Sequence, residues 1–455
     1  MKKNQDINFT EGSIVRQLVL FSVPIVLGEL FQNLYHTVDS LVIGNFADAL
    51  ELAAITVCDS PTNLLVGFFN GMSLGSSVIV ANAFGRGDRK RLEKTIRVSF
   101  SFSVLFGVCM AALSIVLAPL LLRISAVREE IFGQALLYMR IYLIGLTFTI
   151  IYNIAAGILR AVGDSGEPFR ILALSCCINI MLDLLFVVVL HWGLVGVGIA
   201  TVIAEGISAF RTYQVLKRKY EEFRLDFREM KKEKTIIAEL MNVGLPTGLQ
   251  NSLISISNLF VWRYINMFSA VTVAGIGIAQ RLDKFILMPG KALGMTISTF
   301  VGQNEGAGRR KRGMRGIWIG MALAEAFAIC LSLPLYFFAA PLANLFSRDM
   351  EVVATGVAML RVLAPFYFMS FLREILSGAL RGYKKTKWTT ILSMLGMIGL
   401  RQIYLAVSMG IFTPTTTKLF YCYPVGWVSA ALLLLPYFGF ELHQLGSKKE
   451  EEQTC

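Results

Sequence analysis

Charged residues are scarce in this sequence: Asp, Glu, Lys and Arg make up 16% of the 455 residues, whereas soluble globular chains carry roughly a quarter. This scarcity argues against an ordinary soluble enzyme and excludes a disordered chain. The three histidines are too scattered for a zinc site, and the seven cysteines lack the spacing of a metal site or a disulfide scaffold. The phosphate-binding pattern G-x-x-x-x-G-K-S/T is also missing. We therefore expect that the protein is not an enzyme and binds no cofactor. An ion gradient or a partner protein would have to supply the energy for its activity.

Apolar residues are abundant instead, at 55% of the chain with a mean hydropathy of +0.62. They gather in stretches close to the ~20 residues that a helix needs to cross ~30 Å of hydrocarbon. The sequence therefore predicts an all-α integral membrane protein with twelve transmembrane helices and no separate soluble domain. The predicted spans are 14–43, 52–83, 98–122, 131–158, 168–190, 193–216, 236–262, 270–300, 314–338, 352–380, 388–412 and 419–442.

Positive charge alternates between the loops. Most of the 43 Lys and Arg residues fall in every second loop or near the two ends of the chain. The remaining loops hold only Arg123, Arg128, Arg263, Arg348 and Lys418. Since cytoplasmic loops carry the excess of Lys and Arg, we expect a multi-pass protein of the cell membrane with both termini in the cytoplasm. The basic clusters alternate with membrane spans, so no nucleic-acid partner is expected.

The chain contains an internal repeat. Residues 80–94 (VANAFGRGDRKRLEK) align with 301–315 (VGQNEGAGRRKRGMR), and the same offset superposes Gly157, Leu159 and Arg160 on Gly378, Leu380 and Arg381. The repeat predicts an N-terminal lobe at 1–216 and a C-terminal lobe at 236–455, each with six helices, joined by a basic linker at 217–235. Two pseudo-symmetric bundles related by an axis along the membrane normal, with a central cleft, suit alternating access.

Several blocks resemble the multidrug and toxic compound extrusion family, in order and over nearly the whole chain. They are FSVPIVLGELFQNLYHTVDSLVIG (21–44), NAFGRGDRKRLEK (82–94), AAGILRAVGDSGEP (155–168), CCINIMLDLLF (176–186), GLVGVGIATVIAE (193–205) and GIAQRLDKF (277–285). The resemblance implies an antiporter, coupled to H⁺ or Na⁺, that exports amphipathic and often cationic drugs. Its partners would be such small organic molecules and membrane lipids, and we expect a monomer.

Three other transport functions stay open at this point. A major-facilitator carrier also has twelve spans and a basic loop after the second, although Gly85-Arg86-Gly87-Asp88-Arg89-Lys90-Arg91 lacks that family's later glycine. A flippase for lipid-linked oligosaccharides or lipid II would need cationic residues within the spans, and the second half of the chain has several. A channel would more often be built from symmetric subunits than from a repeat within one chain.

A candidate cation-coupling site consists of Asp39, Asn179, Asp183 and Thr201. Asn179 and Asp183 are four residues apart and thus share one helical face, and all four residues fall in the outer half of the N-terminal lobe. Carboxylate, amide and hydroxyl oxygens are hard ligands that suit a proton or Na⁺, and a Na⁺ ion would be held by Asp39, Asn179 and Asp183. The sequence does not choose between the two ions, and no other metal site is expected. The four residues also match the cation-binding positions of the family that the sequence resembles. The alternative interpretation is a structural polar network at Asp183 and a helix end at Asp39.

Polar residues within apolar stretches form a candidate substrate cleft: Glu29, Gln32, Asn33, Tyr35, Asn153, Glu205, Gln250, Asn251, Arg281 and Glu374. Pro24 and Pro246 predict helix bends, because proline removes a backbone donor. Gly67, Gly71 and Gly75 are spaced by four residues and predict a face for close helix packing rather than a ligand site.

Overall fold

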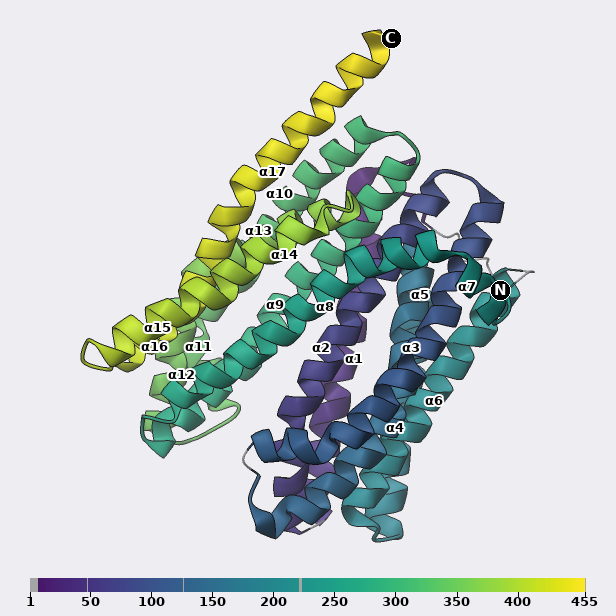
Figure 1. Cartoon of the computed structure of the whole chain (residues 1–455). Helices are drawn as coiled ribbons and strands as arrows, with labels where there is room; N and C mark the ends of the chain where they lie inside the picture. The colour runs from purple at the N-terminus through teal and green to yellow at the C-terminus, as the bar shows by residue number, and fades with distance from the viewer. Residues whose placement is uncertain (1–6, 47, 126, 221–222, 455) are drawn as a thin grey trace. The chain divides into compact units, whose positions relative to one another are not determined.

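The computed structural model describes residues 7–46, 48–125, 127–220 and 223–454, and these residues form helices joined by short loops (Figure 1). The chain is organised in two compact units. The first holds Val19–Ser252 and Gly302–Arg309 together with the described residues up to Gly12. The second holds Ser13–Leu18, Leu253–Val301 and the described residues from Arg310 onwards. The predicted lobe boundaries, at 1–216 and 236–455, stay a prediction.

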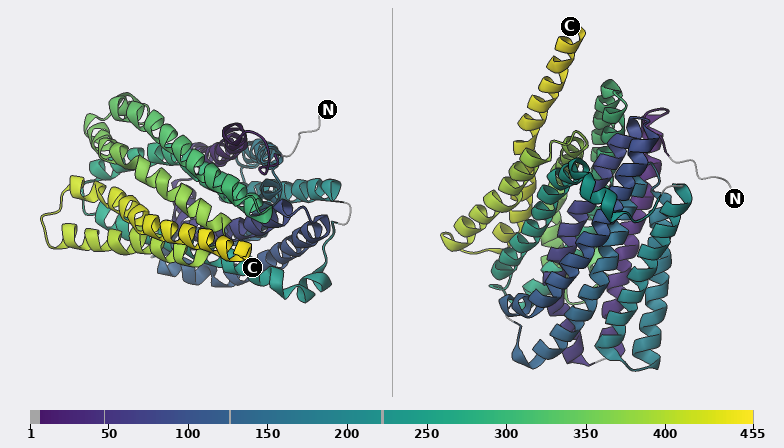
Figure 2. Two further views of the ribbon diagram at one scale, coloured as in Figure 1. Left: turned by 90° about the horizontal axis from the view of Figure 1, so that it is seen from above. Right: turned by 45° about the vertical axis from the view of Figure 1, so that its right-hand side comes forward.

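The first unit is built mainly from six long helices, which lie side by side in the views of Figures 1 and 2. A short helix, α7, and the first part of α8 complete it. The helices that lie wholly or mostly in this unit are α1 (Ile14–Phe46), α2 (Ala49–Gly85), α3 (Arg89–Ile124), α4 (Glu129–Ala161), α5 (Gly166–Asp183), the π-helical η1 (Leu184–Val189), α6 (Gly193–Lys219), α7 (Phe227–Lys232) and α8 (Lys234–Ile265), of which α8 belongs to it up to Ser252.

The second unit contains the later helices and has its own apolar core around Tyr367, Leu405 and Trp427. Its helices are α9 (Ala270–Gly306), α10 (Arg310–Phe337), α11 (Ala339–Asn344), α12 (Met350–Leu363), the 3₁₀-helical η2 (Ala364–Phe366), α13 (Tyr367–Gly382), α14 (Thr386–Met394), the π-helical η3 (Leu395–Leu400), α15 (Arg401–Gly410), α16 (Thr416–Phe420) and α17 (Cys422–Thr454).

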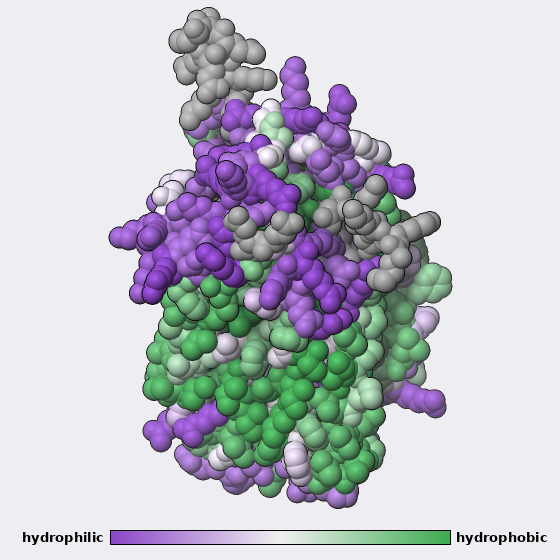
Figure 3. Space-filling view, turned by 90° about the vertical axis from the view of Figure 1, so that its right-hand side faces the viewer, coloured by the Kyte–Doolittle hydropathy of each residue, from purple (hydrophilic) through white to green (hydrophobic). Residues whose placement is uncertain are grey.

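Within the described residues, eleven helical segments are long and apolar enough to cross a membrane. The predicted span at 236–262 is not among these segments, although α8 is a helix of 32 residues. Its polar residues, which include Glu239, Asn242, Gln250 and Asn251, lower its apolar content. On the face shown in Figure 3, apolar side chains form a broad band between two polar regions. This pattern is that of a surface that faces lipid tails between two headgroup layers.

Helices α2 and α8 pack closely through glycines inside the first unit. A Cβ atom added to Gly71 would lie 2.2 Å from the backbone nitrogen of Gly248, and one added to Gly75 would lie 2.6 Å from Cα of Gly244. Asn251 Nδ2 donates to the carbonyl oxygen of Gly67 at 3.1 Å on the same face. The predicted packing role of the α2 glycines is therefore confirmed.

The segment before α1 is tied to the end of α9. Phe9 is completely buried, and its N–H donates to Gln303 Oε1 at 3.0 Å. Asn304 Nδ2 donates to the Phe9 carbonyl oxygen at 3.1 Å, and Gln303 Nε2 donates to the Ala161 carbonyl oxygen at 2.8 Å. These bonds satisfy backbone groups that would otherwise be buried without partners.

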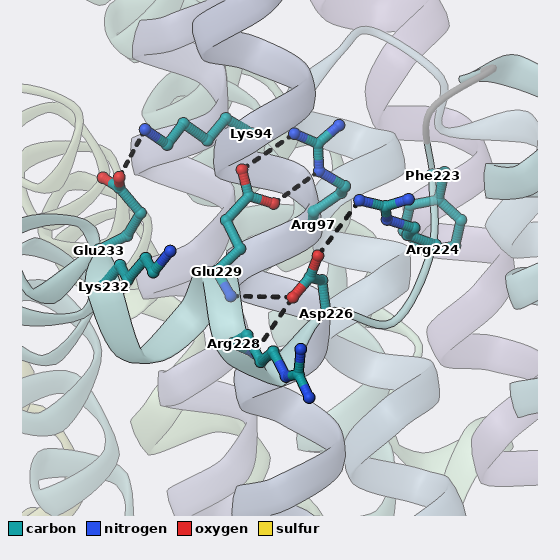
Figure 4. A pocket seen from close by; sticks show the side chains of 9 residues that line it. All are labelled: Lys94, Arg97, Phe223, Arg224, Asp226, Arg228, Glu229, Lys232 and Glu233. Carbon is teal, nitrogen blue, oxygen red and sulfur yellow. Dashed lines mark hydrogen bonds and ion pairs between the residues drawn. The ribbon is translucent and has the colours of Figure 1, made fainter.

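The linker between α6 and α8 forms a polar pocket of about 770 Å³ with the start of α3 (Figure 4). Asp226 caps α7 by accepting from the backbone N–H groups of Arg228 and Glu229 at 3.1 and 2.8 Å. The bond from Glu229, aided by the nearby Arg224 side chain, holds the pKa of the Asp226 carboxyl below its ordinary value. Asp226 thus fixes the start of α7.

We expect that Glu229→Gln lowers the melting temperature of the purified protein by roughly 2–4 °C, as about 1 kcal/mol does in a domain of 150–250 residues. Arg97 donates to Glu229 through Nε at 2.8 Å and Nη2 at 3.0 Å, and the Arg97 side chain is 12% exposed. The matched control is Arg224→Gln, because Arg224 is 76% exposed and lies 3.4 Å from Asp226. An equal effect of both variants would contradict the special role of the Arg97 pair.

Candidate functional site

Two carboxylates meet inside the first unit. Asp39 on α1 is 8% exposed, and Asn179 and Asp183 on α5 are fully buried. The two carboxyl groups are within hydrogen-bonding reach of each other. With its amide nitrogen turned towards the acids, Asn179 donates to Asp183 Oδ2 and to Asp39 Oδ1 at 3.1 Å each. The structure therefore brings together three of the four residues of the predicted coupling site.

The fourth residue, Thr201 on α6, is 4% exposed and lies next to Tyr35 of α1. Thr201 Oγ1 also donates to the Val197 carbonyl oxygen at 3.0 Å. Tyr35 is in electrostatic range of both Asp39 and Glu205. The predicted cleft residues Tyr35 and Glu205 thus belong to the same polar cluster as the predicted coupling site.

Helical spacing explains how the cluster forms. It takes one pair of residues four positions apart from each of three helices: Tyr35 and Asp39 from α1, Asn179 and Asp183 from α5, and Thr201 and Glu205 from α6. Each pair occupies one face of its helix. The π-helical turn η1 begins directly after Asp183, and such turns occur frequently at functional sites. We define these six residues as the acid cluster.

The acid cluster suits a small hard cation. Asp183 Oδ1 is buried and accepts no hydrogen bond from the described residues. Carboxylate, amide and hydroxyl oxygens are the usual ligands of such cations. A proton shared by the two carboxyl groups would satisfy the same need, because two buried carboxylates in contact cannot both carry charge at low cost. Asp39, Asn179 and Asp183 are therefore the residues that would hold H⁺ or Na⁺.

Two tyrosines of α4 also border the acid cluster. Tyr138 and Tyr142 lie in electrostatic range of Asp39, and Tyr142 also of Glu205. The Thr149 side chain, about two helical turns after Tyr142 on α4, lies next to Glu205. Sequence reasoning missed these α4 residues because aromatic and hydroxyl side chains in an apolar stretch resemble ordinary packing residues. Their spacing by four and seven residues was the available signal.

The other predicted cleft residues in the first unit have varied surroundings. Glu29, Gln32 and Asn33 are half-buried on α1, where Asn33 Nδ2 donates to the Glu29 carbonyl oxygen at 2.8 Å. Asn153 Nδ2 on α4 is buried without a partner among the described residues. Gln250 is buried, and Asn251 is engaged by the Gly67 carbonyl oxygen. Pro24 and Pro246 both lie inside long helices, α1 and α8.

The two predicted cleft residues of the second unit do not form a comparable acidic site. Arg281 is exposed on α9, and Glu374 on α13 forms an ion pair with its neighbour Arg373. Asp283 accepts a hydrogen bond from the Tyr367 hydroxyl at 2.8 Å. Asp283 and Glu374 thus each have a partner within this unit, whereas Glu325 Oε1 on α10 is buried without a hydrogen bond from the described residues.

Comparison with known proteins identifies the family to which the chain belongs. The sequence model of the MatE family matches residues 24–185 and 246–407. "Probable multidrug resistance protein YpnP" of Bacillus subtilis is 29% identical over 88% of this chain and 89% of its own length. "Probable multidrug resistance protein YoeA" of the same organism is 26% identical over 95% of each chain.

A solved structure described as the outward-facing conformation of a multidrug resistance MATE family transporter matches with a TM-score of 0.90. The match covers 98% of this chain and 100% of that chain at 20% sequence identity. It confirms the predicted all-α fold of twelve transmembrane helices, and the two matches of the family model confirm the repeat. The chain therefore belongs to the MatE family of membrane transporters, the multidrug and toxic compound extrusion family that its sequence resembles.

Proposed function

We propose that the protein is a cation-coupled antiporter that exports small amphipathic, often cationic, drugs and toxic compounds by alternating access. The observation that carries this function is the buried contact between Asp39, Asn179 and Asp183 within apolar spans. A carboxylate at mid-bilayer costs at least ~2.5–3.5 kcal/mol on insertion scales, so residues of this kind mark ion or substrate pathways. The names of the relatives as multidrug resistance proteins support export of small organic molecules.

An ion gradient would supply enough energy for this export. One elementary charge that moves through 100 mV releases ~2.3 kcal/mol, which corresponds to about a fiftyfold concentration ratio. A proton or Na⁺ bound at the acid cluster would be exchanged for the drug. The coupling ion takes the place of a cofactor in this scheme.

Helix α1 is the element through which the cation acts in this proposal. Pro24 removes one backbone hydrogen bond about four turns before Asp39, and Pro246 does the same in α8. Binding of the cation at Asp39 and Asp183 would bias the bend of α1 and thereby weaken drug binding. Glu29, Gln32, Asn33 and Tyr35 lie on α1 between Pro24 and Asp39 and would contact the drug.

The two lobes and the membrane orientation of the chain complete the proposal. The lobes at 1–216 and 236–455, joined by the linker at 217–235, would be the two moving halves of a monomer in the cell membrane. Both termini would lie in the cytoplasm, since the basic loops are on their side. Membrane lipids surround the apolar band seen in Figure 3.

The test is efflux of ethidium from proteoliposomes with a pH gradient and a sodium gradient imposed separately. We expect export driven by one of the two gradients, and the active gradient identifies the ion. Family membership excludes the major-facilitator carrier that the sequence left open. The buried Arg373, Arg381 and Arg401 favour a flippase of anionic lipid precursors as the second candidate. Flipping of a fluorescent lipid precursor, with no ethidium export under either gradient, would replace the antiporter by this flippase.

A further inference from the structure

The position in the second half that corresponds to the acid cluster carries a positive charge. The two matches of the family model begin at residues 24 and 246 and end at 185 and 407, so they have equal lengths. Counted from these ends, at an offset of 222 residues, Asn179 falls opposite Arg401 and Tyr35 opposite Ser257, one residue away from the offset of 221 that aligns residues 80–94 with 301–315. Asp39 and Asp183 correspond to Val261 and Leu405. Both carboxylates are thus replaced by apolar residues, and the amide is replaced by a guanidinium group.

Arg401, like Asn179, forms a buried contact between two helices. Arg401 Nη2 on α15 donates to Ser257 Oγ on α8 at 2.6 Å, just as Asn179 connects α5 with α1. Gln402 Nε2 donates to the same hydroxyl at 2.8 Å and to the Ser257 carbonyl oxygen at 2.9 Å. The π-helical turn η3 ends directly before Arg401, whereas η1 begins directly after Asp183. Both positions are therefore buried contacts beside a π-helical turn.

Arg401 has no counter-charge among the residues that the structure describes. It is 2% exposed within the apolar span Thr386–Gly410. In the part of the chain that the structure describes, no carboxylate forms an ion pair with Arg401, and its Nε has no hydrogen-bond partner. The titratable side chains in its electrostatic range are Cys422 and Tyr423. A buried charge is costly unless it is paired, so an anion that joins this site would gain a strong interaction.

The neighbours of Arg401 present hydrogen-bond donors. The Ser257 hydroxyl accepts bonds from both Arg401 and Gln402, so its own hydrogen points elsewhere and finds no acceptor among the described residues. The Tyr423 hydroxyl accepts from Gln280 Nε2 at 2.8 Å and likewise keeps its own hydrogen for another acceptor. Ser257 and Tyr423 therefore offer donors to an anion beside Arg401, and the Asp283 carboxylate, which lies in electrostatic range of Tyr423, is bound by the Tyr367 hydroxyl.

We propose that Arg401, Ser257 and Tyr423 form an anion-binding centre in the second half of the chain. Its ligand is a small monovalent anion, either a free halide ion or the carboxylate of a transported molecule. The acid cluster of the first half and this anion centre of the second half have opposite charge at corresponding positions. The anion centre is independent of the ion that drives transport, so either proposal can fail without the other.

The test is thermal unfolding of the purified wild-type protein during titration with sodium chloride, sodium acetate or sodium benzoate. Ionic strength is held constant with a bulky buffer sulfonate. We expect a saturable rise in melting temperature with at least one of these salts. A response to chloride identifies a halide site, whereas a response to the carboxylates alone identifies the carboxylate of a transported molecule. Absence of a saturable response to all three salts would overturn the proposal.

Variants of the proposed centre test whether the anion-dependent rise in melting temperature arises there. Arg401→Gln is expected to remove it, and Arg401→Lys to retain it with affinity weaker by about tenfold, because lysine keeps the charge but not the planar donors. The matched control is Arg281→Gln, since Arg281 is an exposed arginine of the same unit. If Arg401→Gln does not fold, Ser257→Ala and Tyr423→Phe each still have to weaken anion affinity by about tenfold. A wild-type response in these variants would refute the centre.

Discussion

The variant Asp183→Asn is expected to lose gradient-driven ethidium export and to fall to the rate of empty liposomes. Asp183 is fully buried, contacts Asp39 and Asn179, and keeps one carboxylate oxygen without a hydrogen bond from the described residues. Asparagine has the same shape but cannot take up and release a proton, and it contributes no charge to a Na⁺ site. The coupling ion would therefore lose its binding site while the helix packing stays intact.

Substrate binding separates this loss of coupling from a loss of folding. We expect ethidium to bind the purified Asp183→Asn variant within about threefold of the wild-type affinity, a difference below 1 kcal/mol. In the wild-type protein the coupling ion should weaken ethidium binding, and in the variant it should not. Fluorescence polarisation of ethidium, with and without the ion, measures both effects.

The matched control is Asp283→Asn, which removes a half-buried carboxylate from α9 in the second unit. Asp283 is bound by the Tyr367 hydroxyl and is not part of the acid cluster. It should therefore retain gradient-driven export. Wild-type export by Asp183→Asn, or equal losses in both variants, would show that coupling does not depend on the acid cluster.

The helices were largely predictable because membrane crossing imposes a strong length requirement. Each predicted span lies within or overlaps a helical segment of the structure, as 131–158 does with α4 and 193–216 with α6. The internal breaks in these segments were not predictable. The π-helical turns after Asp183 and before Arg401 have apolar sequences that are equally suited to a continuous α-helix.

The acid cluster was predictable within each helix but not between helices. A spacing of four residues places Asn179 and Asp183 on one face, and this needs no tertiary information. Which faces of α1, α5 and α6 meet depends on packing, and the resemblance to a family supplied that part. Reasoning from single helices also could not show that Tyr35, a predicted cleft residue, lies beside Asp39 and Glu205.

The buried hydrogen bonds of the Phe9 backbone could not be predicted from the sequence either. Gln303 and Asn304 lie at the end of a long apolar helix and resemble loop residues in the sequence. Their partners, Phe9 and Ala161, are separated from them by more than a hundred residues. Such bonds form because a buried backbone group needs a hydrogen-bond partner. The local sequence does not show which distant residue becomes that partner.

The variant Gly71→Ala is expected to disrupt the contact between α2 and α8. The added Cβ would lie 2.2 Å from the backbone nitrogen of Gly248 and 2.4 Å from its Cα, and neither atom can move as a side chain can. The helices would have to separate, and overpacking of this kind costs typically 1–3 kcal/mol. We expect the melting temperature of the purified protein to fall by roughly 5 °C or more and gradient-driven export to fall with it.

A control on the same helix face makes this prediction sharp. A Cβ added to Gly67 would meet its nearest neighbour, the Cβ of Asn251, at an ordinary 3.5 Å. Alanine also stabilises a helix interior by ~0.5–1 kcal/mol relative to glycine. Gly67→Ala should therefore leave the melting temperature unchanged or raise it, whereas Gly71→Ala, one turn away, lowers it. Equal melting temperatures of the two variants would mean that α2 and α8 are not held at the distance seen here, since helix propensity alone favours both substitutions.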